Sequence, residues 1–349
     1  MSALRELRPG YGISRIIKGG WQLAGDHGAV DPERAIADMA AFVDAGITTF
    51  DCADIYTGVE AMIGRFLRRY RERQGVEAAS AIKVHTKLVP DIDALGRIDR
   101  AYVERIIERS RARLGVERLD LVQFHWWDYE APGCIEALGH LAALQREGRI
   151  DRIGTTNFDL EHLQALRETA DVVSAQAQFS LLDQRPAGPF ADWCRANGVA
   201  IFAYGVLAGG FLTDTWLGKP DPGHAFENRS LIKYRLIIDE FGGWELFQAL
   251  LAQLRAIADR HGVSIANVAV RAMLDHPDVS AVILGARYAH HLPQNLRVLS
   301  LRLDQQDRAR LERLLAQRKG PSGPVYGLER DRAGRHGRIM KYHLNTADA

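Results

Sequence analysis

Residues 47–53 (ITTFDCA), 81–87 (AIKVHTK) and 119–125 (LDLVQFH) are three short apolar runs, each of which reaches a polar side chain at or near its end. The segment 98–115 (IDRAYVERIIERSRARLG) precedes the third run, carries apolar residues at helical spacing and closes on a glycine. Buried strands that alternate with amphipathic helices form parallel sheets covered by helices. This part of the chain therefore predicts an α/β fold.

The same alternation continues in both directions along the chain. Eight apolar runs read as strands, at residues 14–21, 47–53, 81–87, 119–125, 150–155, 172–178, 199–204 and 280–286. At about 150 residues per domain, a chain of 349 residues could form two domains or one large barrel. No Pro/Gly/Ser-rich linker divides it, so we expect a single (β/α)8 TIM barrel.

Two segments add length beyond the strands, helices and short loops of such a barrel. Residues 205–230 are rich in Gly and Pro, lack periodicity and predict a long functional loop after the seventh strand. After further helices at 240–262, 263–277, 291–299 and 304–318, a Gly-rich tail covers residues 320–349. We expect the barrel domain to span 1–319. The tail is either disordered or crosses the barrel mouth, anchored by Val325, Tyr326, Ile339, Met340 and Tyr342.

Composition excludes several classes of protein. The 45 Lys and Arg residues nearly balance the 44 Asp and Glu residues, so no overall field favours a nucleic acid or a membrane surface as partner. Cys52, Cys134 and Cys194 form no C-x-x-C pair, which argues against a disulfide framework or a thiolate zinc site. We expect neither a secretory leader nor a membrane-spanning segment, and we expect a cytoplasmic protein. Residues 228–230 (NRS) then match a glycosylation acceptor only by chance.

Familiar catalytic motifs are missing. Residues 10–15 (GYGISR) begin like a dinucleotide-binding turn but carry Arg15 where the last glycine belongs, and no P-loop follows. The sequence contains neither H-E-x-x-H nor G-x-S-x-G. Rossmann, P-loop, metalloprotease and serine-hydrolase sites are therefore not indicated.

Polar side chains mark the ends of three successive strands instead. Asp51, Lys87 and His125 stand at the carboxyl ends of their runs, which is the catalytic rim of a barrel. Neighbouring strands lie about 4.8 Å apart, so these side chains can converge. Tyr56 follows Asp51 by five residues and can fold back over them. An Asp51–Lys87 pair with a purely structural role is the alternative.

These four groups together can move a proton to a carbonyl oxygen. A phenol has a pKa near 10, and we expect Lys87 to lower that of Tyr56 by about 3 units. Asp51 would keep the buried lysine charged. We expect His125 to hydrogen-bond the substrate oxygen, whereas His85 is assigned to the barrel interior without a role.

The residues also resemble a known family. The stretch 50–67 (FDCADIYTGVEAMIGRFL), followed by 85–88 (HTKL) and 120–128 (DLVQFHWWD), is similar to the signature of the aldo-keto reductase superfamily. The resemblance extends from Gly20 to about Leu299. It implies a TIM barrel in which Asp51, Tyr56, Lys87 and His125 are catalytic. It also implies NAD(P)H-dependent reduction of an aldehyde or ketone, or the reverse oxidation of an alcohol or sugar, without a metal.

The resemblance implies a cofactor site as well. Its residues would be Thr156, Asn157, Gln176, Tyr204, Gly205, Leu207, Gly210, Gly285, Ala286, Arg287, Gln294 and Asn295. Tyr204 would stack on the nicotinamide ring. Gly205 and Val206 stand where the family usually has Ser and Pro. Arg287 favours NADP(H), because a guanidinium suits a 2′-phosphate, while NAD(H) stays possible.

Aromatic residues near the strand ends indicate the substrate pocket. We expect Trp21 and Trp126 to line it around a small carbonyl compound, and we assign Trp127 to the opposite face. Two other functions stay open. One is a nucleotide-binding regulatory member that resembles channel β subunits and turns over little. The other is a metal-dependent barrel hydrolase that uses Asp51, His85 and His125. The sequence decides neither the physiological substrate nor the oligomeric state.

Overall fold

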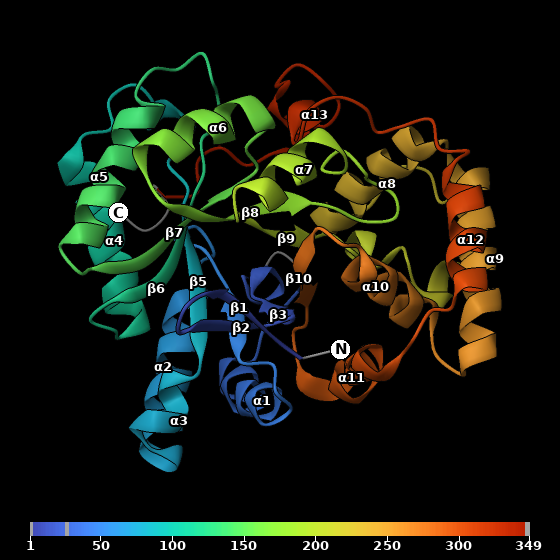
Figure 1. Cartoon of the computed structure of the whole chain (residues 1–349), viewed down its shortest axis with the longest axis horizontal. Helices are drawn as coiled ribbons and strands as arrows, with labels where there is room; N and C mark the ends of the chain where they lie inside the picture. Colours follow the sequence, from blue (N-terminus) through green and yellow to red (C-terminus); the bar gives the residue numbers. More distant parts are fainter. Residues whose placement is uncertain (1–2, 25–27, 346–349) are drawn as a thin grey trace.

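Eight parallel strands close into a barrel at the centre of the molecule (Figure 1). The computed structural model describes residues 3–24 and 28–345. The barrel follows the chain from β3 to β10, and β10 pairs with both β9 and β3 to close it. Its strands are β3 (Ile16–Gly19), β4 (Thr49–Asp51), β5 (Lys83–Leu88), β6 (Leu119–Phe124), β7 (Ile150–Thr156), β8 (Val172–Gln178), β9 (Ala200–Tyr204) and β10 (Val279–Gly285). The predicted TIM barrel is confirmed.

Helices surround the barrel and cover the apolar outer face of its strands. They are α1 (Pro32–Asp44), α2 (Val59–Gln74), α3 (Val76–Ser80), α4 (Arg100–Leu114), α5 (Cys134–Arg146), α6 (Leu160–Thr169), α7 (Pro189–Ala196), α8 (Arg229–Phe241), α9 (Trp244–His261), α10 (Ile265–Asp275), α11 (Leu292–Ser300), α12 (Gln305–Leu315) and α13 (Gly327–Arg330). Short 3₁₀ turns are η1 (Trp21–Leu23), η2 (Ile92–Ala94), η3 (Ala208–Gly210), η4 (Asp214–Trp216), η5 (Ala289–His291) and η6 (Gly337–Ile339).

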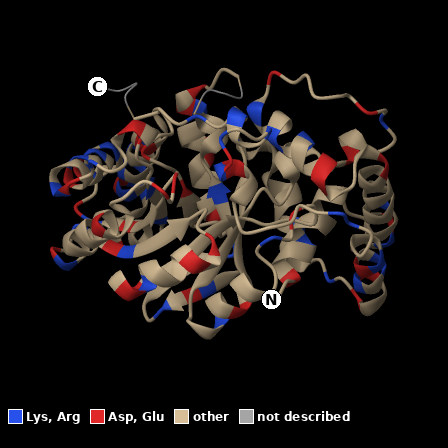
Figure 2. Cartoon of the chain, turned by 90° about the horizontal axis from the view of Figure 1, so that it is seen from above, with Lys and Arg blue, Asp and Glu red and all other residues tan. Residues whose placement is uncertain are grey.

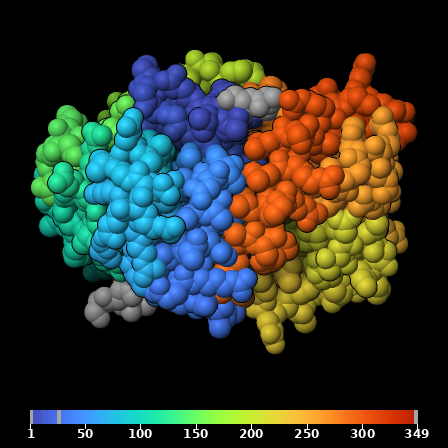
Figure 3. Space-filling model, turned by 90° about the horizontal axis from the view of Figure 1, so that it is seen from below, coloured from blue at the N-terminus to red at the C-terminus, as the bar shows by residue number. Residues whose placement is uncertain are grey.

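Local sequence signals explain where several of these helices begin and end. The Asp99 carboxylate accepts a hydrogen bond from the Tyr102 amide and caps α4, whose last turn leads into Gly115 in the left-handed region. Asp31 caps α1 in the same way. Space-filling Figure 3 shows the blue surface around α1 bordering the orange surface that follows β10. The first and last units of the barrel therefore meet.

An N-terminal hairpin, which the sequence analysis did not predict, closes one end of the barrel. Its strands are β1 (Leu4–Arg8) and β2 (Tyr11–Ser14), joined through Gly10 at a positive φ. Tyr11 and Ile13 pack with barrel residues such as Leu121 and Phe202 in a second apolar cluster. The catalytic rim therefore lies at the other, carboxyl end of the strands.

The loop after β9 is shorter than expected because α8 begins inside it. The Asn228 side chain accepts hydrogen bonds from the Ser230 and Leu231 amides, so the tripeptide that resembled a glycosylation acceptor is a helix cap. The remaining loop carries η3 and η4. Gly205 adopts a positive φ, and a Cβ there would collide with the Tyr234 hydroxyl. This contact fixes the start of the loop against α8.

The tail lies over the carboxyl end of the barrel from Gly320 to Asn345. Arg330 on α13 donates hydrogen bonds to the backbone oxygens of Trp126, Trp127 and Asn157. Its guanidinium lies 3.6 Å from the centre of the Tyr129 ring. Further along, the Leu344 and Asn345 amides donate to Asp91. Residues 346–349 of the predicted tail lie outside the described residues.

Charged side chains of both signs are interspersed over the outer helices (Figure 2). This mixture agrees with the formal net charge of +1. Within the described ranges, we find no helix that combines the length and the apolar character needed to cross a membrane.

Candidate active site

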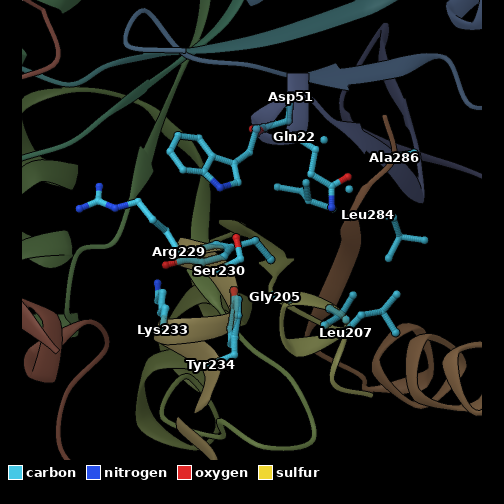
Figure 4. Close-up of a pocket in the computed structure, with 18 of the residues that line it drawn as sticks. Gln22, Asp51, Gly205, Leu207, Arg229, Ser230, Lys233, Tyr234, Leu284 and Ala286 are labelled. Atoms are coloured by element: carbon cyan, nitrogen blue, oxygen red, sulfur yellow. The ribbon is translucent and has the colours of Figure 1, made fainter. Parts of the chain in front are cut away.

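A cavity of about 1080 Å³ opens at the carboxyl end of the barrel. Its wall is formed by strand ends, by the loop after β9 together with α8, and by the tail. Figure 4 shows Asp51, Lys233 and Ala286 entering this space from three different elements. Each of the four residues predicted to be catalytic, Asp51, Tyr56, Lys87 and His125, lines it. The barrel therefore brings together groups that lie up to 74 positions apart in the sequence.

Asp51 and Lys87 form a buried ion pair beneath the cavity. Lys87 Nζ lies 2.9 and 2.8 Å from the two Asp51 carboxylate oxygens and donates a further bond to the Cys52 carbonyl. Burial favours loss of the ammonium proton, but Asp51 and Tyr56 outweigh it and raise the pKa of Lys87 above its ordinary value. The lysine therefore stays charged near neutral pH.

Tyr56 lies directly above this pair. Lys87 Nζ is 5.1 Å from the centre of its ring, and the Trp21 ring is 5.0 Å away on another side. Burial raises the pKa of Tyr56 to about 12, although Lys87 opposes the rise. The expectation that Lys87 would bring this pKa below 10 is therefore wrong, because desolvation exceeds the attraction of the ammonium. The phenol keeps its proton near neutral pH, as a proton donor must.

His125 presents a lone pair to the cavity. Its Nδ1 lies 3.0 Å from the carbonyl oxygen of Thr156, which can only accept, so Nδ1 carries a proton. Burial and the charge of Arg330 lower the pKa of His125 to about 3, so the ring is neutral. Its Nε2 is buried without a hydrogen-bond partner among residues 3–24 and 28–345. Nε2 can therefore accept a hydrogen bond. It carries no proton, so it cannot donate a hydrogen bond to a carbonyl oxygen.

The residues expected around a nicotinamide ring lie beside the four polar groups. Gln176 donates to Asp51 at 2.7 Å and accepts from the Thr156 hydroxyl at 3.2 Å, so it links these groups to the ion pair. The Tyr204 hydroxyl donates to Asn157 at 2.8 Å, and Asn157 adopts a left-handed backbone with φ of 65°. The two side-chain pairs, Gln176 with Thr156 and Tyr204 with Asn157, are joined through the backbone, where the Asn157 amide donates to the Gln176 carbonyl.

The residues expected around the phosphates and the adenosine line the far end of the cavity. They are Gly205, Leu207, Gly210, Gly285, Ala286, Arg287, Gln294 and Asn295. The buried Lys18 donates to the Ala286 carbonyl at 3.1 Å and holds this end in place. A Cβ on Gly285 would lie 2.7 Å from the Gln22 amide, so a larger residue there would require the Gln22 side chain to move. A flat aromatic face, amide groups and a guanidinium in one elongated cavity fit a nicotinamide dinucleotide.

The structure reverses the expected roles of two tryptophans. Trp126 is fully buried outside the cavity, where it packs against Phe124 and donates to the Ala131 carbonyl. Trp127 lines the cavity, with its ring 4.3 Å from that of His125. Side chains alternate along an extended chain, so the residue two positions after His125 shares its face and the residue between them does not. Trp21 lies on the wall as expected.

Several lining residues were not found from the sequence. Four of them come from α8: Arg229 and Ser230, which lie inside the predicted loop 205–230, and Lys233 and Tyr234, for which no element is predicted. The apolar spacing of Leu231, Tyr234 and Ile238 behind an Asn cap was the available signal. Tyr326 and Met340 come from the tail, where they were noted only as possible anchors; the Tyr326 ring lies 5.8 Å from that of His125.

The trio considered for a metal hydrolase does not meet. His85 packs between Phe202 and Tyr11 in the barrel interior and is not part of the cavity wall, unlike Asp51 and His125. Burial lowers the pKa of His85 to about 3, so its ring is neutral. The described part of the chain contains no cluster of three or more His, Cys, Asp or Glu side chains able to hold a metal.

Known proteins with the same architecture cover most of this chain. The aldo-keto reductase YhdN of Bacillus subtilis is 26% identical over 321 residues, which are 91% of this chain and 95% of that protein. The NADH-specific methylglyoxal reductase of Escherichia coli is 25% identical over 319 residues, which are 87% and 95%.

Solved structures of other proteins have the same fold. An aldo-keto reductase from Klebsiella pneumoniae in complex with NADPH is 25% identical, with a TM-score of 0.66 over 89% of this chain and 95% of that one. A glycerol dehydrogenase from Gluconobacter oxydans has the same fold, with a TM-score of 0.74, 24% identity and coverage of 90% and 95%. The model of the aldo/keto reductase family matches residues 15–316, nearly the whole barrel, and the chain belongs to this family.

Proposed function

We propose that the protein reduces an aldehyde or ketone with NADPH, or catalyses the reverse oxidation, and that Tyr56 is the proton donor. Members of this family are oxidoreductases. The observation that carries the proposal is the buried Asp51–Lys87 pair beneath a protonated Tyr56 at the cavity. This arrangement suits a reaction that gives a proton to an oxygen atom and afterwards must stabilise the phenolate.

The residues divide the work as follows. Tyr56 donates its hydroxyl proton to the carbonyl oxygen, and the Lys87 ammonium, held by Asp51, stabilises the charge that remains on the phenol. His125 Nε2 accepts a hydrogen bond from the hydroxyl group that forms, which orients the alcohol. Trp21 and Trp127 exclude water beside the reacting oxygen.

Asn157, Gln176 and Tyr204 would hold the nicotinamide, and the loop after β9 would cover the pyrophosphate. A reduced nicotinamide dinucleotide bound there supplies the hydride. The choice of dinucleotide is part of the proposal: one relative is named an NADH-specific reductase, whereas one solved structure holds NADPH. Arg287 on the cavity wall favours NADPH.

The direct test follows the oxidation of NADPH and NADH at 340 nm with a panel of aldehydes, ketones and sugars. We expect turnover with NADPH for at least one class of carbonyl compound. Tight binding of either dinucleotide without turnover of any of them would overturn the proposal and favour a regulatory role.

Replacing Arg287 with alanine tests the choice of cofactor. Loss of one charge-assisted hydrogen bond to a 2′-phosphate costs about 1.5–3 kcal/mol. We therefore expect Arg287→Ala to weaken NADPH binding about 10- to 100-fold and to leave NADH binding nearly unchanged, as measured by titration of the protein fluorescence. Arg313→Ala, on the exposed face of α12, is the control. Equal losses for both dinucleotides would show that Arg287 does not contact the phosphate.

A further inference from the structure

Lys233 stands on the cavity wall without a hydrogen bond. It lies on the second turn of α8, lines the cavity, and has a side chain that is 16% exposed. Its ammonium has three donors, yet none reaches an acceptor within residues 3–24 and 28–345 at hydrogen-bond distance. The nearest carboxylate oxygen, on Glu329 of the tail, is 3.9 Å away. A partly buried ammonium that donates no hydrogen bond to the protein is available to a polar ligand in the cavity.

Three tyrosine rings hold this ammonium in place without using its hydrogens. Lys233 Nζ lies 5.2 Å from the centre of the Tyr204 ring, 5.7 Å from Tyr234 and 5.5 Å from Tyr326. Aromatic faces attract a cation within about 6 Å but accept no conventional hydrogen bond from it. The cage therefore fixes the charge and leaves the N–H groups available to a guest in the cavity.

Glu329 cannot serve as the missing acceptor, because another cation already occupies it. Arg185 donates to both of its carboxylate oxygens, at 2.8 and 3.1 Å, and also pairs with Asp183. Burial lowers the pKa of Lys233 below its ordinary value, and the attraction of Glu329 and Asp183 does not compensate. Glu329 therefore gives Lys233 a long ion pair at 3.9 Å but no hydrogen bond.

The charged side chains around Lys233 favour an anionic group as the bound ligand. Arg185 and Lys233 balance Asp183 and Glu329, so these four groups sum to zero. Arg229, one helical turn before Lys233, lines the same cavity and has no ion pair among the described residues. These five groups carry one excess positive charge, and Lys341 of the tail lines the same cavity, so this wall favours an anionic group such as a carboxylate.

The position of Lys233 favours the substrate side of the cavity. Tyr326 touches both the His125 ring, at 5.8 Å, and Lys233. In Figure 4, Lys233 and Arg229 lie on the side away from Leu284 and Ala286, where the adenosine end of the cofactor is expected. We infer that Lys233 binds a carboxylate on the substrate, so that the preferred substrates are aldehydes or ketones that carry an acid group. This inference rests on the proposed carbonyl reduction and adds the substrate class to it.

The test compares an acid with its neutral ester. The probes are 4-carboxybenzaldehyde and methyl 4-formylbenzoate, which share the ring and the aldehyde. We expect the wild-type protein to prefer the acid in kcat/KM. Lys233→Met should lower kcat/KM for the acid about 10- to 100-fold and change that for the ester less than about 3-fold. Lys233→Arg should restore most of the loss, and Lys319→Met, on the exposed surface, should change neither value.

Two outcomes would overturn the inference. Equal losses for acid and ester in Lys233→Met would assign the lysine to the structural network around Arg185. Weaker NADPH binding, in a fluorescence titration, together with an unchanged preference for the acid would assign it to the cofactor.

Failure of the proposed function is distinguishable from failure of this inference. If the wild-type protein turned over no carbonyl compound, calorimetry would compare 4-(hydroxymethyl)benzoate with its methyl ester, each added to the NADP-saturated protein. Tighter binding of the acid that Lys233→Met removes and Lys233→Arg retains would still support the anion site. Equal binding of acid and ester would exclude it.

Discussion

Replacing Tyr56 with phenylalanine should lower kcat/KM for carbonyl reduction by about 10²- to 10⁴-fold, the range typical of general acid catalysis. The ring that packs beside Trp21 stays, and only the hydroxyl group is lost. The neutral His125, which lines the same wall, cannot replace it, because its Nε2 presents an acceptor. Stopped-flow or steady-state assays of NADPH oxidation would measure the loss in kcat.

The same variant should bind NADPH normally, because the proposed cofactor contacts do not include the phenol. A change in its dissociation constant of less than about threefold would separate chemistry from binding. Tyr70→Phe, on α2 and outside the cavity, is the matched control and should keep full activity. Full activity in Tyr56→Phe would refute the assignment of the proton donor.

Replacing Arg185 with methionine should cause the largest loss of stability that we expect from a single substitution. Arg185 pairs with Asp183 and Glu329, and all three side chains are at most 2% exposed. Although burial alone would raise it, Arg185 and Lys233 lower the pKa of Glu329 to about 2. Without Arg185 two buried carboxylates lose their partner, so we expect the free energy of unfolding to fall by about 3–5 kcal/mol.

Urea denaturation monitored by circular dichroism would measure this change. The control is Arg65→Met, which removes an exposed ion pair with Glu33 and should cost no more than about 1 kcal/mol. Because Glu329 belongs to the tail, limited proteolysis should also cut the Arg185→Met variant earlier between residues 320 and 345. Similar stabilities of the two variants would show that the buried network contributes little.

The barrel could be predicted because each of its strands and helices is recognisable from a short stretch of sequence. Each strand is an apolar run and each helix has an apolar face, so eight repeats were visible without any knowledge of contacts. Asp51, Lys87 and His125 could be placed together for a similar reason, since parallel strands end at one edge. The hairpin at Leu4–Ser14 was not predicted, because it packs against the open end of the barrel, which exists only in the folded protein.

The features of the site that could not be predicted from the sequence depend on burial and on contacts between distant residues. The pKa of Tyr56 rises because the site excludes water, a quantity that no motif encodes. The proton on His125 is fixed by the Thr156 carbonyl, which belongs to the next strand. The surroundings of Lys233 could not be predicted, because Tyr326 and Glu329 reach it from the tail.

The position of the tail also determines when the pocket can be completed during synthesis of the chain. Asp51, Tyr56, Lys87 and His125 leave the ribosome long before Glu329, which shares the charge of Arg185. A chain that stops before residue 326 would carry every proposed catalytic group and still have an open wall, with Lys233 missing one side of its aromatic cage. Such a fragment would bind substrate poorly and be more open to proteases, so the pocket is complete only after the tail has been made.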